Sequence, residues 1–323
     1  MRVVVVDENV GPWLEADEGL PAEGIEILRT DAARAPAQLR DADAYVGVYF
    51  PDDLREAAGE RFSFLQVTAA GVDHIDIDAL PGRVTVANAY GHERSIAEHV
   101  LMVTFALRRR LFAADRALRD GRWSSRLVDP QVPGFSTLRG ARVGIVGWGH
   151  IAREIAAVVQ GLGATVAAVT RTPERATDSE LAEWIGGYDD TRRLAAESEV
   201  LILACPLVDR TRHLVDDEVL RALGEGGVLV NVARGAVVDD GALYRALVGG
   251  EILGAAIDVW DVPAGASPVS QHPLAEAENI IMTPHYSATA VDTYQHRAAQ
   301  VADNLRRVGR GEAPTTLIRG GER

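Results

Sequence analysis

The sequence feature that most constrains the fold is a glycine-rich turn between an apolar run and a helical segment. The run Val143–Val146 leads into Gly147-Trp-Gly149-His-Ile-Ala152, and an Ala- and Val-rich stretch follows. The first glycine permits a tight turn, the second lets backbone N–H groups approach a pyrophosphate, and the small sixth residue keeps helix and strand close. Glycine turns can be purely structural, but strand, turn, helix and second strand in succession predict a dinucleotide-binding unit.

The apolar runs around this turn fit the same interpretation. Between Arg142 and Thr283, short apolar runs alternate with helix-compatible segments. The runs are Val143–Val146, Thr165–Thr170, Val200–Ala204, Gly227–Asn231, Gly254–Asp258 and Asn279–Met282. Strands in this number, with helical connections, predict a doubly wound Rossmann sheet.

The N-terminal part of the chain shows a similar alternation. Its apolar runs are Val3–Val6, Ile25–Leu28, Ala44–Val48, Phe64–Thr68 and Val84–Ala87. Unbroken runs of Val, Ile and Leu are typical of parallel strands buried on both faces. We therefore expect a second open α/β sheet here.

Two segments without proline or glycine predict the remaining long helices. Ser95–Leu118 has apolar residues at helical spacing and predicts one helix, followed by an irregular loop at Trp123–Gly140. Thr289–Val308 predicts a closing helix that folds back on the first domain. The expected organisation is one discontinuous domain, residues 1–98 and 286–323, with residues 99–285 inserted as the dinucleotide-binding domain.

Composition excludes several classes of protein. All 33 basic residues are arginine, so a Schiff base, a pyridoxal phosphate anchor and a Walker-type phosphate loop cannot form. The only cysteine, Cys205, excludes an internal disulfide and a Cys-rich metal site, and the histidines lack metal-ligand spacing. A net charge of −14 argues against a nucleic-acid partner. No apolar run suits a membrane helix or a signal peptide, so we expect a cytoplasmic protein.

The residues after the second strand of such a sheet influence the choice of cofactor. An acidic residue there hydrogen-bonds the adenosine ribose and repels a 2′-phosphate. This chain has Thr170-Arg171-Thr172 instead, whose hydroxyls and guanidinium can hold the phosphate. The pattern favours NADP(H) over NAD(H). The alternative is that Arg171 stacks on adenine and that Glu174 weakens the preference.

Several motifs together resemble the D-isomer-specific 2-hydroxyacid dehydrogenase family over nearly the whole chain. Val67–Asp76 resembles its substrate loop, Ser95–His99 the start of its interdomain helix, and Ala204–Leu207 a loop beside the nicotinamide. Asn231–Asp239 is similar to its arginine motif and Thr283–His285 to its histidine motif. The resemblance implies a Rossmann domain inserted in a flavodoxin-like substrate domain, a homodimer, and hydride transfer between NAD(P)H and C2 of a small 2-oxo or 2-hydroxy acid.

The chemistry of that reaction explains which residue types it needs. Hydride addition to a ketone puts negative charge on the C2 oxygen, so a proton donor and a fixed positive charge must lie beside it. The resemblance implies that His285 is the acid and base and that Arg234 binds the substrate. The backbone of Ala69, Ala70 and Gly71 would bind the substrate carboxylate. The implied cofactor contacts are Gly147, Trp148, Gly149, His150, Ile151, Thr170, Arg171, Thr172, Cys205, Pro206, Val232, Ala233, Asp258 at the nicotinamide carboxamide, and His285.

One departure from the family pattern concerns the partner of the histidine. The family has a glutamate that hydrogen-bonds the histidine, and Pro263 stands at that position here. Asp261 is the nearest carboxylate, and we expect it either to replace the glutamate or to leave His285 without that partner. An unassisted histidine is only about one-quarter protonated at pH 7, whereas a carboxylate that raises its pKa by about one unit makes that roughly three-quarters.

Other functions remain open at this stage. One alternative is a dehydrogenase of another small anion, such as formate or phosphite, on the same scaffold. A second is a non-enzymatic corepressor-like dimer that binds dinucleotide, for which the missing glutamate leaves room. Arg234 could also pair with Asp239, and the turn at Gly71 could be purely structural. The retention of both Arg234 and His285 favours the dehydrogenase.

Overall fold

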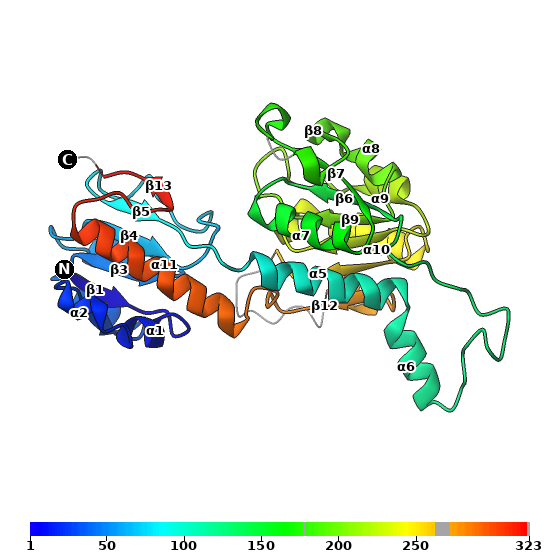
Figure 1. Ribbon diagram of the computed structural model, residues 1–323, viewed down its shortest axis with the longest axis horizontal. Coiled ribbons are helices and arrows are strands. Elements are labelled where there is room, and N and C mark those ends of the chain that lie inside the picture. The colour runs from blue at the N-terminus through cyan, green and yellow to red at the C-terminus, as the bar shows by residue number, and fades with distance from the viewer. Residues whose placement is uncertain (177–178, 262–271, 322–323) are drawn as a thin grey trace. The chain divides into compact units, whose positions relative to one another are not determined.

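The computed structural model describes residues 1–176, 179–261 and 272–321 (Figure 1). These form two compact units: Met1–His92 with Thr289–Arg323, and Glu93–Ala288. The chain passes from unit 1 to unit 2 after His92 and returns to unit 1 after Ala288. The boundaries predicted from the sequence lie at 98/99 and 285/286. The helix that begins at Glu93 packs along its length against the second unit, and this packing sets the first boundary.

Unit 1 is built on a six-stranded sheet. Its strands are β1 (Arg2–Val5), β2 (Glu26–Arg29), β3 (Ala44–Gly47), β4 (Phe64–Val67), β5 (Thr85–Ala87) and β13 (Leu317–Arg319). Their order is β13-β5-β4-β3-β1-β2, parallel except for β13, which pairs antiparallel with β5. Without β13 this is the 2-1-3-4-5 order of flavodoxin-like folds.

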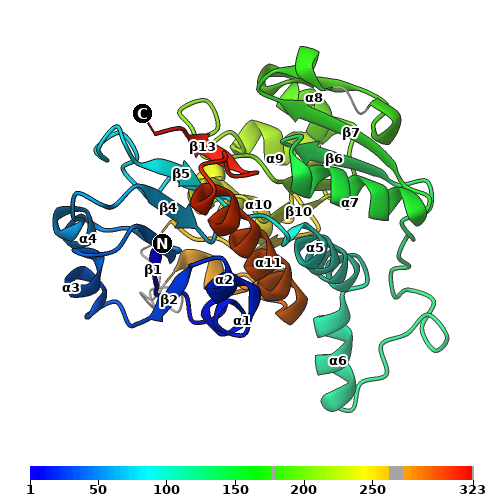
Figure 2. The same cartoon turned by 60° about the vertical axis from the view of Figure 1, so that its left-hand side comes forward.

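Helices cover both faces of the unit 1 sheet. One face packs against α1 (Gly11–Glu15), α2 (Gly19–Ala22) and α11 (Val291–Gly309). The other face packs against α3 (Ala35–Leu39) and α4 (Asp52–Ala57). Figure 2 shows α11 crossing the sheet, which places the C-terminal part of the chain against strands from its beginning.

Unit 2 is built on a seven-stranded, wholly parallel sheet. Its strands are β6 (Arg142–Val146), β7 (Thr165–Thr170), β8 (Ile185–Gly187), β9 (Val200–Leu203), β10 (Val228–Asn231), β11 (Gly254–Ile257) and β12 (Ile280–Met282). The order β12-β11-β10-β9-β6-β7-β8 is the 3-2-1-4-5-6 order of dinucleotide-binding folds with one further strand. The expected class, two doubly wound α/β sheets, is confirmed.

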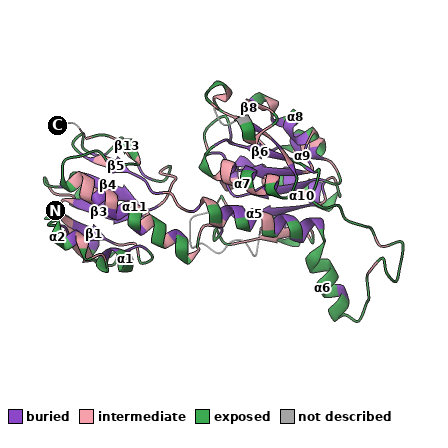
Figure 3. Ribbon diagram, in the orientation of Figure 1, coloured by how far each residue is buried: buried purple, intermediate pink, exposed green. Residues whose placement is uncertain are grey.

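The helices of unit 2 lie on both faces of its sheet. On one face lie α5 (Glu93–Arg108) and α7 (His150–Gly161). On the other lie α8 (Thr191–Ala196), α9 (Asp217–Leu223) and α10 (Asp240–Val248). The strands are buried between the two layers, as Figure 3 shows in purple.

The single helix expected over Ser95–Leu118 is wrong, because the structure breaks it in two. α5 ends at Arg108, and α6 (Leu111–Arg119) begins after Arg110, whose φ of 51° is left-handed. Three consecutive arginines lie at the break. The guanidinium of Arg108 is buried and pairs with Glu199 (3.1 Å). The guanidinium of Arg109 lies over the ring of Phe135, 4.5 Å from its centroid.

Residues 111–140 form an arm that projects from the body of unit 2 (Figures 1 and 2). It consists of α6 and an irregular segment, and most of it is exposed (Figure 3). Its large apolar side chains that are more than half exposed are Leu111, Phe112, Leu118, Trp123, Leu127, Val128 and Phe135. None of the helices described is long and apolar enough to cross a membrane.

Candidate active site

The glycine turn connects β6 to α7. Gly147 has a φ of 103°, and a Cβ built there would lie 2.6 Å from the carbonyl oxygen of Ala204, so only glycine fits between β6 and the end of β9. Gly149 precedes α7, and a Cβ there would meet nothing within 4 Å. The turn therefore leaves open space above the N-terminus of a long helix, which suits a pyrophosphate. Trp148 lies between the two glycines of this turn, and α7 begins with His150 and Ile151.

The carboxyl end of β7 carries the three residues expected to select the cofactor. Thr170 is the register partner of Gly187 on β8, so Arg171 lies across from Tyr188. Burial raises the pKa of Tyr188 to about 12, and the charges of Arg171 and Arg210 oppose that rise. Arg171 is exposed and Thr172 half-buried. The end of β7 thus carries a guanidinium and two hydroxyls and no carboxylate.

The residues after β9 and β10 are closely packed. Cys205 is buried, and burial raises the pKa of its thiol to about 12, so the thiol stays protonated at neutral pH and is no nucleophile. Pro206 follows it. Val232 and Ala233 are buried directly after β10. All four positions lie at the carboxyl edge of the unit 2 sheet, where ligands of such sheets bind.

Arg234 is held by the asparagine that ends β10. Asn231 Oδ1 accepts a hydrogen bond from Ala233 N, and its Nδ2 donates to Arg234 O, both at 3.0 Å. The Arg234 guanidinium is half-buried and donates to Ala233 O (2.8 Å). Gly235 packs directly on the next loop, because a Cβ there would lie 2.4 Å from Asp261 N.

His285 lies in an exposed loop after β12 and has a left-handed backbone, with a φ of 58°. The carboxylate of Asp258, the first residue after β11, holds that loop. Its Oδ1 accepts from Thr283 Oγ1 (2.6 Å) and from Tyr286 N (3.0 Å), and its Oδ2 accepts from Ser287 N (3.1 Å). Asp258 thus binds the chain on both sides of His285. The sequence analysis assigns this carboxylate to the nicotinamide carboxamide and does not anticipate these bonds.

Three further contacts fix the histidine loop within unit 2. Trp260 Nε1 donates to Thr283 O (2.9 Å), and Ser95 Oγ on α5 donates to Ser287 O (2.6 Å). His99 packs its ring edge-on against Tyr286 (5.5 Å). Burial lowers the pKa of His99, although the charge of Asp258 acts in the opposite direction. Ser95 and His99 belong to a motif that the sequence analysis interprets only as the start of a helix.

Arg234 and His285 follow two strands of one sheet. Arg234 follows β10 and His285 follows β12, with β11 between them. Strand spacing separates β10 from β12 by about 10 Å, which two long side chains can span. The loop after β11 contacts both neighbours, because Asp261 N packs on Gly235 while Asp258 and Trp260 hold residues 283–287. The two side chains expected to share one carbonyl therefore lie at the same edge of the same sheet.

Asp261, the candidate partner of His285, is exposed and lies at the end of the described segment that follows β11. Its charge acts on Asp240, whose pKa burial raises and whose carboxylate lies 3.0 Å from His272 Nε2. Pro263 lies outside the described residues. No group of His, Cys, Asp and Glu in the described parts of the chain could hold a metal ion.

In unit 1, the substrate-loop residues Ala69, Ala70 and Gly71 follow the carboxyl end of β4. All three are half-buried. The carbonyl of Ala69 accepts from Ala89 N (3.2 Å), and that of Ala70 accepts from Asn88 Nδ2 (2.7 Å). Hydrogen bonds thus fix the carbonyl groups of this loop. Asn88, which makes one of these bonds, was not predicted from the sequence.

Comparison with known proteins agrees with these motifs. Residues 101–287 match the model of the D-isomer specific 2-hydroxyacid dehydrogenase NAD binding domain. A glyoxylate reductase of Korarchaeum cryptofilum is 30% identical over 97% of this chain and 91% of its own. A glyoxylate/hydroxypyruvate reductase of Arabidopsis thaliana is 32% identical over 75% of this chain and 72% of its own.

Solved structures are similar over the full length. The NADPH-dependent glyoxylate/hydroxypyruvate reductase of Sinorhizobium meliloti has a TM-score of 0.79 at 28% identity, over 98% of this chain and 97% of that one. A D-lactate dehydrogenase of Treponema pallidum has a TM-score of 0.82 at 26% identity, over 99% and 100%. The chain belongs to the D-isomer specific 2-hydroxyacid dehydrogenase family and is an NAD(P)-dependent enzyme of that family.

Proposed function

We propose that this protein reduces a small 2-oxo acid to the D-2-hydroxy acid, with Arg234 binding the substrate and His285 supplying the proton. The observation that carries the proposal is that Arg234 and His285 follow strands at one edge of the unit 2 sheet, the edge that also carries the open glycine turn. The glycine turn at Gly147 and Gly149 would hold the reduced dinucleotide, which when bound would supply the hydride to C2. As negative charge grows on the C2 oxygen, Arg234 stabilises it and His285 donates its proton to that oxygen.

In the oxidative direction His285 accepts the proton of the hydroxyl. Arg234 suits the substrate because its guanidinium can bind a carboxylate by two parallel hydrogen bonds. In unit 1, the N–H groups of Ala70 and Gly71 are the donors that we propose for a substrate carboxylate. Asp258 and Trp260 hold the backbone of the histidine loop, so His285 needs little reorganisation during the reaction.

Glyoxylate and hydroxypyruvate are the substrates we propose first. The names of the relatives from Korarchaeum, Arabidopsis and Sinorhizobium support this choice. We propose NADPH as the preferred cofactor, because Arg171 with Thr170 and Thr172 offers a cation and two hydroxyls in place of a carboxylate. The Sinorhizobium relative is NADPH-dependent.

We propose a homodimer in which the arm, residues 111–140, contacts the second copy. The arm exposes a row of large apolar side chains over one continuous segment, which is unusual for a surface that faces only water. The helix α5, from which the arm projects, also exposes Met102 and Phe105.

The test follows oxidation of NADPH and NADH with glyoxylate, hydroxypyruvate, pyruvate and branched 2-oxo acids between pH 5 and 9. We expect turnover of the small acids with NADPH, and its loss by at least about 1000-fold in Arg234→Gln and His285→Gln. Arg171→Gln should raise KM for NADPH but not for NADH, whereas Arg192→Gln, a control at an exposed residue of α8, should change neither. Binding of dinucleotide without turnover of any acid would favour the corepressor-like alternative. Turnover of formate or phosphite would favour a dehydrogenase of another small anion.

A further inference from the structure

The substrate loop of unit 1 presents two backbone donors that its own fold leaves without an acceptor. The carbonyls of Ala69 and Ala70 both point at residues 88–89, since they accept from Ala89 N and from Asn88 Nδ2. In a trans peptide the N–H points opposite to the preceding C=O. The N–H groups of Ala70 and Gly71 therefore face away from residues 88–89, and neither donates to an acceptor within the described residues.

Asn88 owes its position to bonds from elements far along the sequence. Its N–H donates to Thr316 O (3.2 Å). Its carbonyl oxygen accepts from Gln66 Nε2 (2.8 Å) and from Thr316 Oγ1 (2.6 Å). The backbone of Asn88 is thus fixed by β4 on one side and by the segment before β13 on the other.

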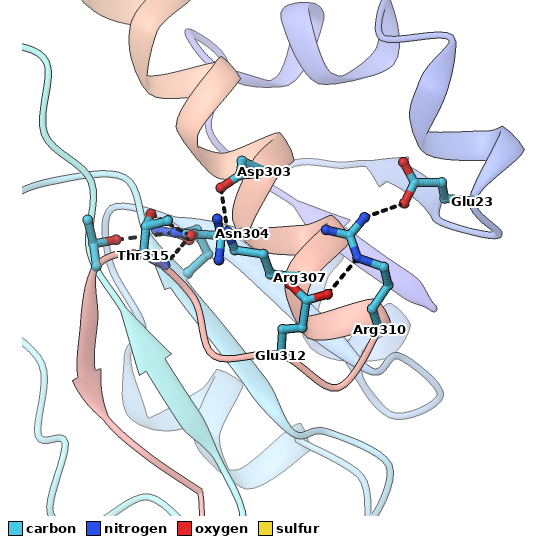
Figure 4. A network of polar contacts seen from close by, with 9 residues as sticks. Glu23, Asp303, Asn304, Arg307, Arg310, Glu312 and Thr315 are labelled. Atoms are coloured by element: carbon cyan, nitrogen blue, oxygen red, sulfur yellow. Dashed lines mark hydrogen bonds and ion pairs between the residues drawn. The ribbon is translucent and has the colours of Figure 1, made fainter.

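The centre of this network is Asn304 on α11, which is completely buried (Figure 4). Its Nδ2 donates to Gln66 Oε1 (2.8 Å) and to Thr316 Oγ1 (3.2 Å). Its Oδ1 accepts from Thr315 N (2.8 Å) and from Thr315 Oγ1 (2.9 Å). Every hydrogen-bonding position of the amide is used, so Asn304 fixes the orientation of the Gln66 amide as well.

The side chain of Asn88, unlike that of Asn304, uses only part of its hydrogen-bonding capacity. It is 2% exposed, its Nδ2 donates to Ala70 O, and its Oδ1 is buried without a partner within the described residues. Burial of an unpaired carbonyl oxygen costs about as much as one neutral hydrogen bond contributes. The amide therefore adds little net stability, and its specific contribution is the direction in which it holds the Ala70–Gly71 peptide.

We propose that Asn88 is a positioning residue for substrate binding: through the Ala70 carbonyl it aims the N–H groups of Ala70 and Gly71 at the substrate carboxylate. This role rests on the proposed function, because it needs a carboxylate as ligand. Asn304 orients Gln66 and Thr316, and these two residues hold the backbone of Asn88. The side chain of Asn88 in turn orients the loop. The C-terminal helix of the chain thereby orients a loop that follows the fourth strand.

The decisive variant is Asn88→Asp, which keeps size and shape but replaces the donor at Ala70 O with an acceptor. We expect KM for glyoxylate to rise at least about tenfold, kcat at saturation to change less than about threefold, and the Kd of NADPH to stay the same. Asn88→Ala removes the donor together with the unpaired oxygen, so it should remain folded and show the same direction of change. Asn279→Asp is the matched control, since the Asn279 amide, like that of Asn88, donates to backbone carbonyl oxygen but lies in unit 2.

A second readout does not depend on turnover. Amide hydrogen exchange of the peptide that contains Ala89, whose N–H donates to Ala69 O, should become faster in Asn88→Asp and Asn88→Ala and stay unchanged in Asn279→Asp. If wild type reduces no 2-oxo acid, the proposed function fails, and the exchange rates alone then decide whether Asn88 orders the loop. An unchanged KM in a folded, active Asn88→Ala variant, or unchanged exchange at Ala89, would overturn the proposal.

Discussion

At the scale of single residues, the backbone of His285 is the most informative feature of the site. A left-handed conformation costs a residue other than glycine roughly 1–2 kcal/mol. The hydrogen bonds of Asp258, Trp260 and Ser95 to residues 283 and 286–287 offset that cost. The position of His285, the proposed acid–base group, is thus fixed by the backbone on either side of it.

Asp258→Asn should separate this anchoring from cofactor binding. The NH2 group of the new amide would face either Ser287 N or the pair Thr283 Oγ1 and Tyr286 N, all of which are donors. The hydrogen bonds on one side of the loop would therefore be lost. We expect kcat to fall by up to about 100-fold through misplacement of His285, with little change in the Kd of NADPH measured by fluorescence titration. Asp31→Asn, at an exposed carboxylate of unit 1, is the control and should leave kcat and its pH profile unchanged. A large loss of NADPH affinity in Asp258→Asn would instead assign the carboxylate to the cofactor.

His99 makes stability depend on pH. Burial holds its pKa in the folded state below the ordinary value of 6.5, so the unfolded chain takes up a proton first as pH falls. The free energy of unfolding should therefore decrease below about pH 6.5, by at most about 1.4 kcal/mol per pH unit from this residue. His99→Gln should flatten that part of the profile in urea unfolding. His296→Gln, on an exposed position of α11, should not.

Much of the site could be predicted at this scale, because the glycine, arginine and histidine motifs are short sequence patterns whose residue types indicate their chemistry. Gly147 and Gly149 are recognisable from spacing alone. Asp258, Ser95 and Asn88 act through hydrogen bonds to distant backbone, and such pairings appear only once the fold brings the segments together. The exposed position of Asp261 was likewise beyond a sequence argument, since one side chain's reach depends on the path of its loop.

At the scale of elements, the arm shows how a local charge pattern changes a helix. Apolar spacing from Ser95 to Leu118 predicts one helix, and the periodicity indeed continues through both α5 and α6. The pairing of Arg108 with Glu199 and the left-handed Arg110 divide it. Two strands were also missed: β8 contains two glycines, and β13 is a short, partly exposed edge strand, so neither shows a buried apolar run.

Polar substitutions on the arm should separate the proposed dimer. Phe112→Asp combined with Leu118→Asp places two carboxylates among the exposed apolar side chains, and their desolvation opposes association. We expect light scattering to report half the wild-type mass at micromolar concentration. Val248→Asp, at an equally exposed apolar position of α10, should leave the mass unchanged. Wild-type protein that is already monomeric would contradict the proposal.

At the scale of the whole molecule, each unit closes a sheet and a core of its own. Unit 2 is continuous in sequence, and its two ends meet, because Ser95 Oγ donates to Ser287 O. In unit 1 the neighbouring segments also meet, since Tyr90 N donates to Gln300 Oε1 (2.8 Å). The interruption of unit 1 by nearly two hundred residues therefore leaves its core intact.

Residues 93–288 should fold and bind NADPH when produced alone. At 100 times its Kd, the cofactor should add about 2.7 kcal/mol to the free energy of unfolding of this fragment. Calorimetry with and without NADPH measures this increment, and the fragment carrying Arg171→Gln provides the comparison. An isolated fragment that stays unfolded would show that its sheet depends on unit 1.

The Ser95–Ser287 bond has a practical consequence for redesign. A module whose entry and exit lie side by side can be cut out and replaced without stretching the host on either side. A foreign cofactor module with the same spacing between its ends could be spliced in at residues 92 and 289, leaving the sheet and the Ala69–Gly71 loop of unit 1 untouched. Chimeras of this kind would show how far the choice of reductant can be changed without rebuilding unit 1.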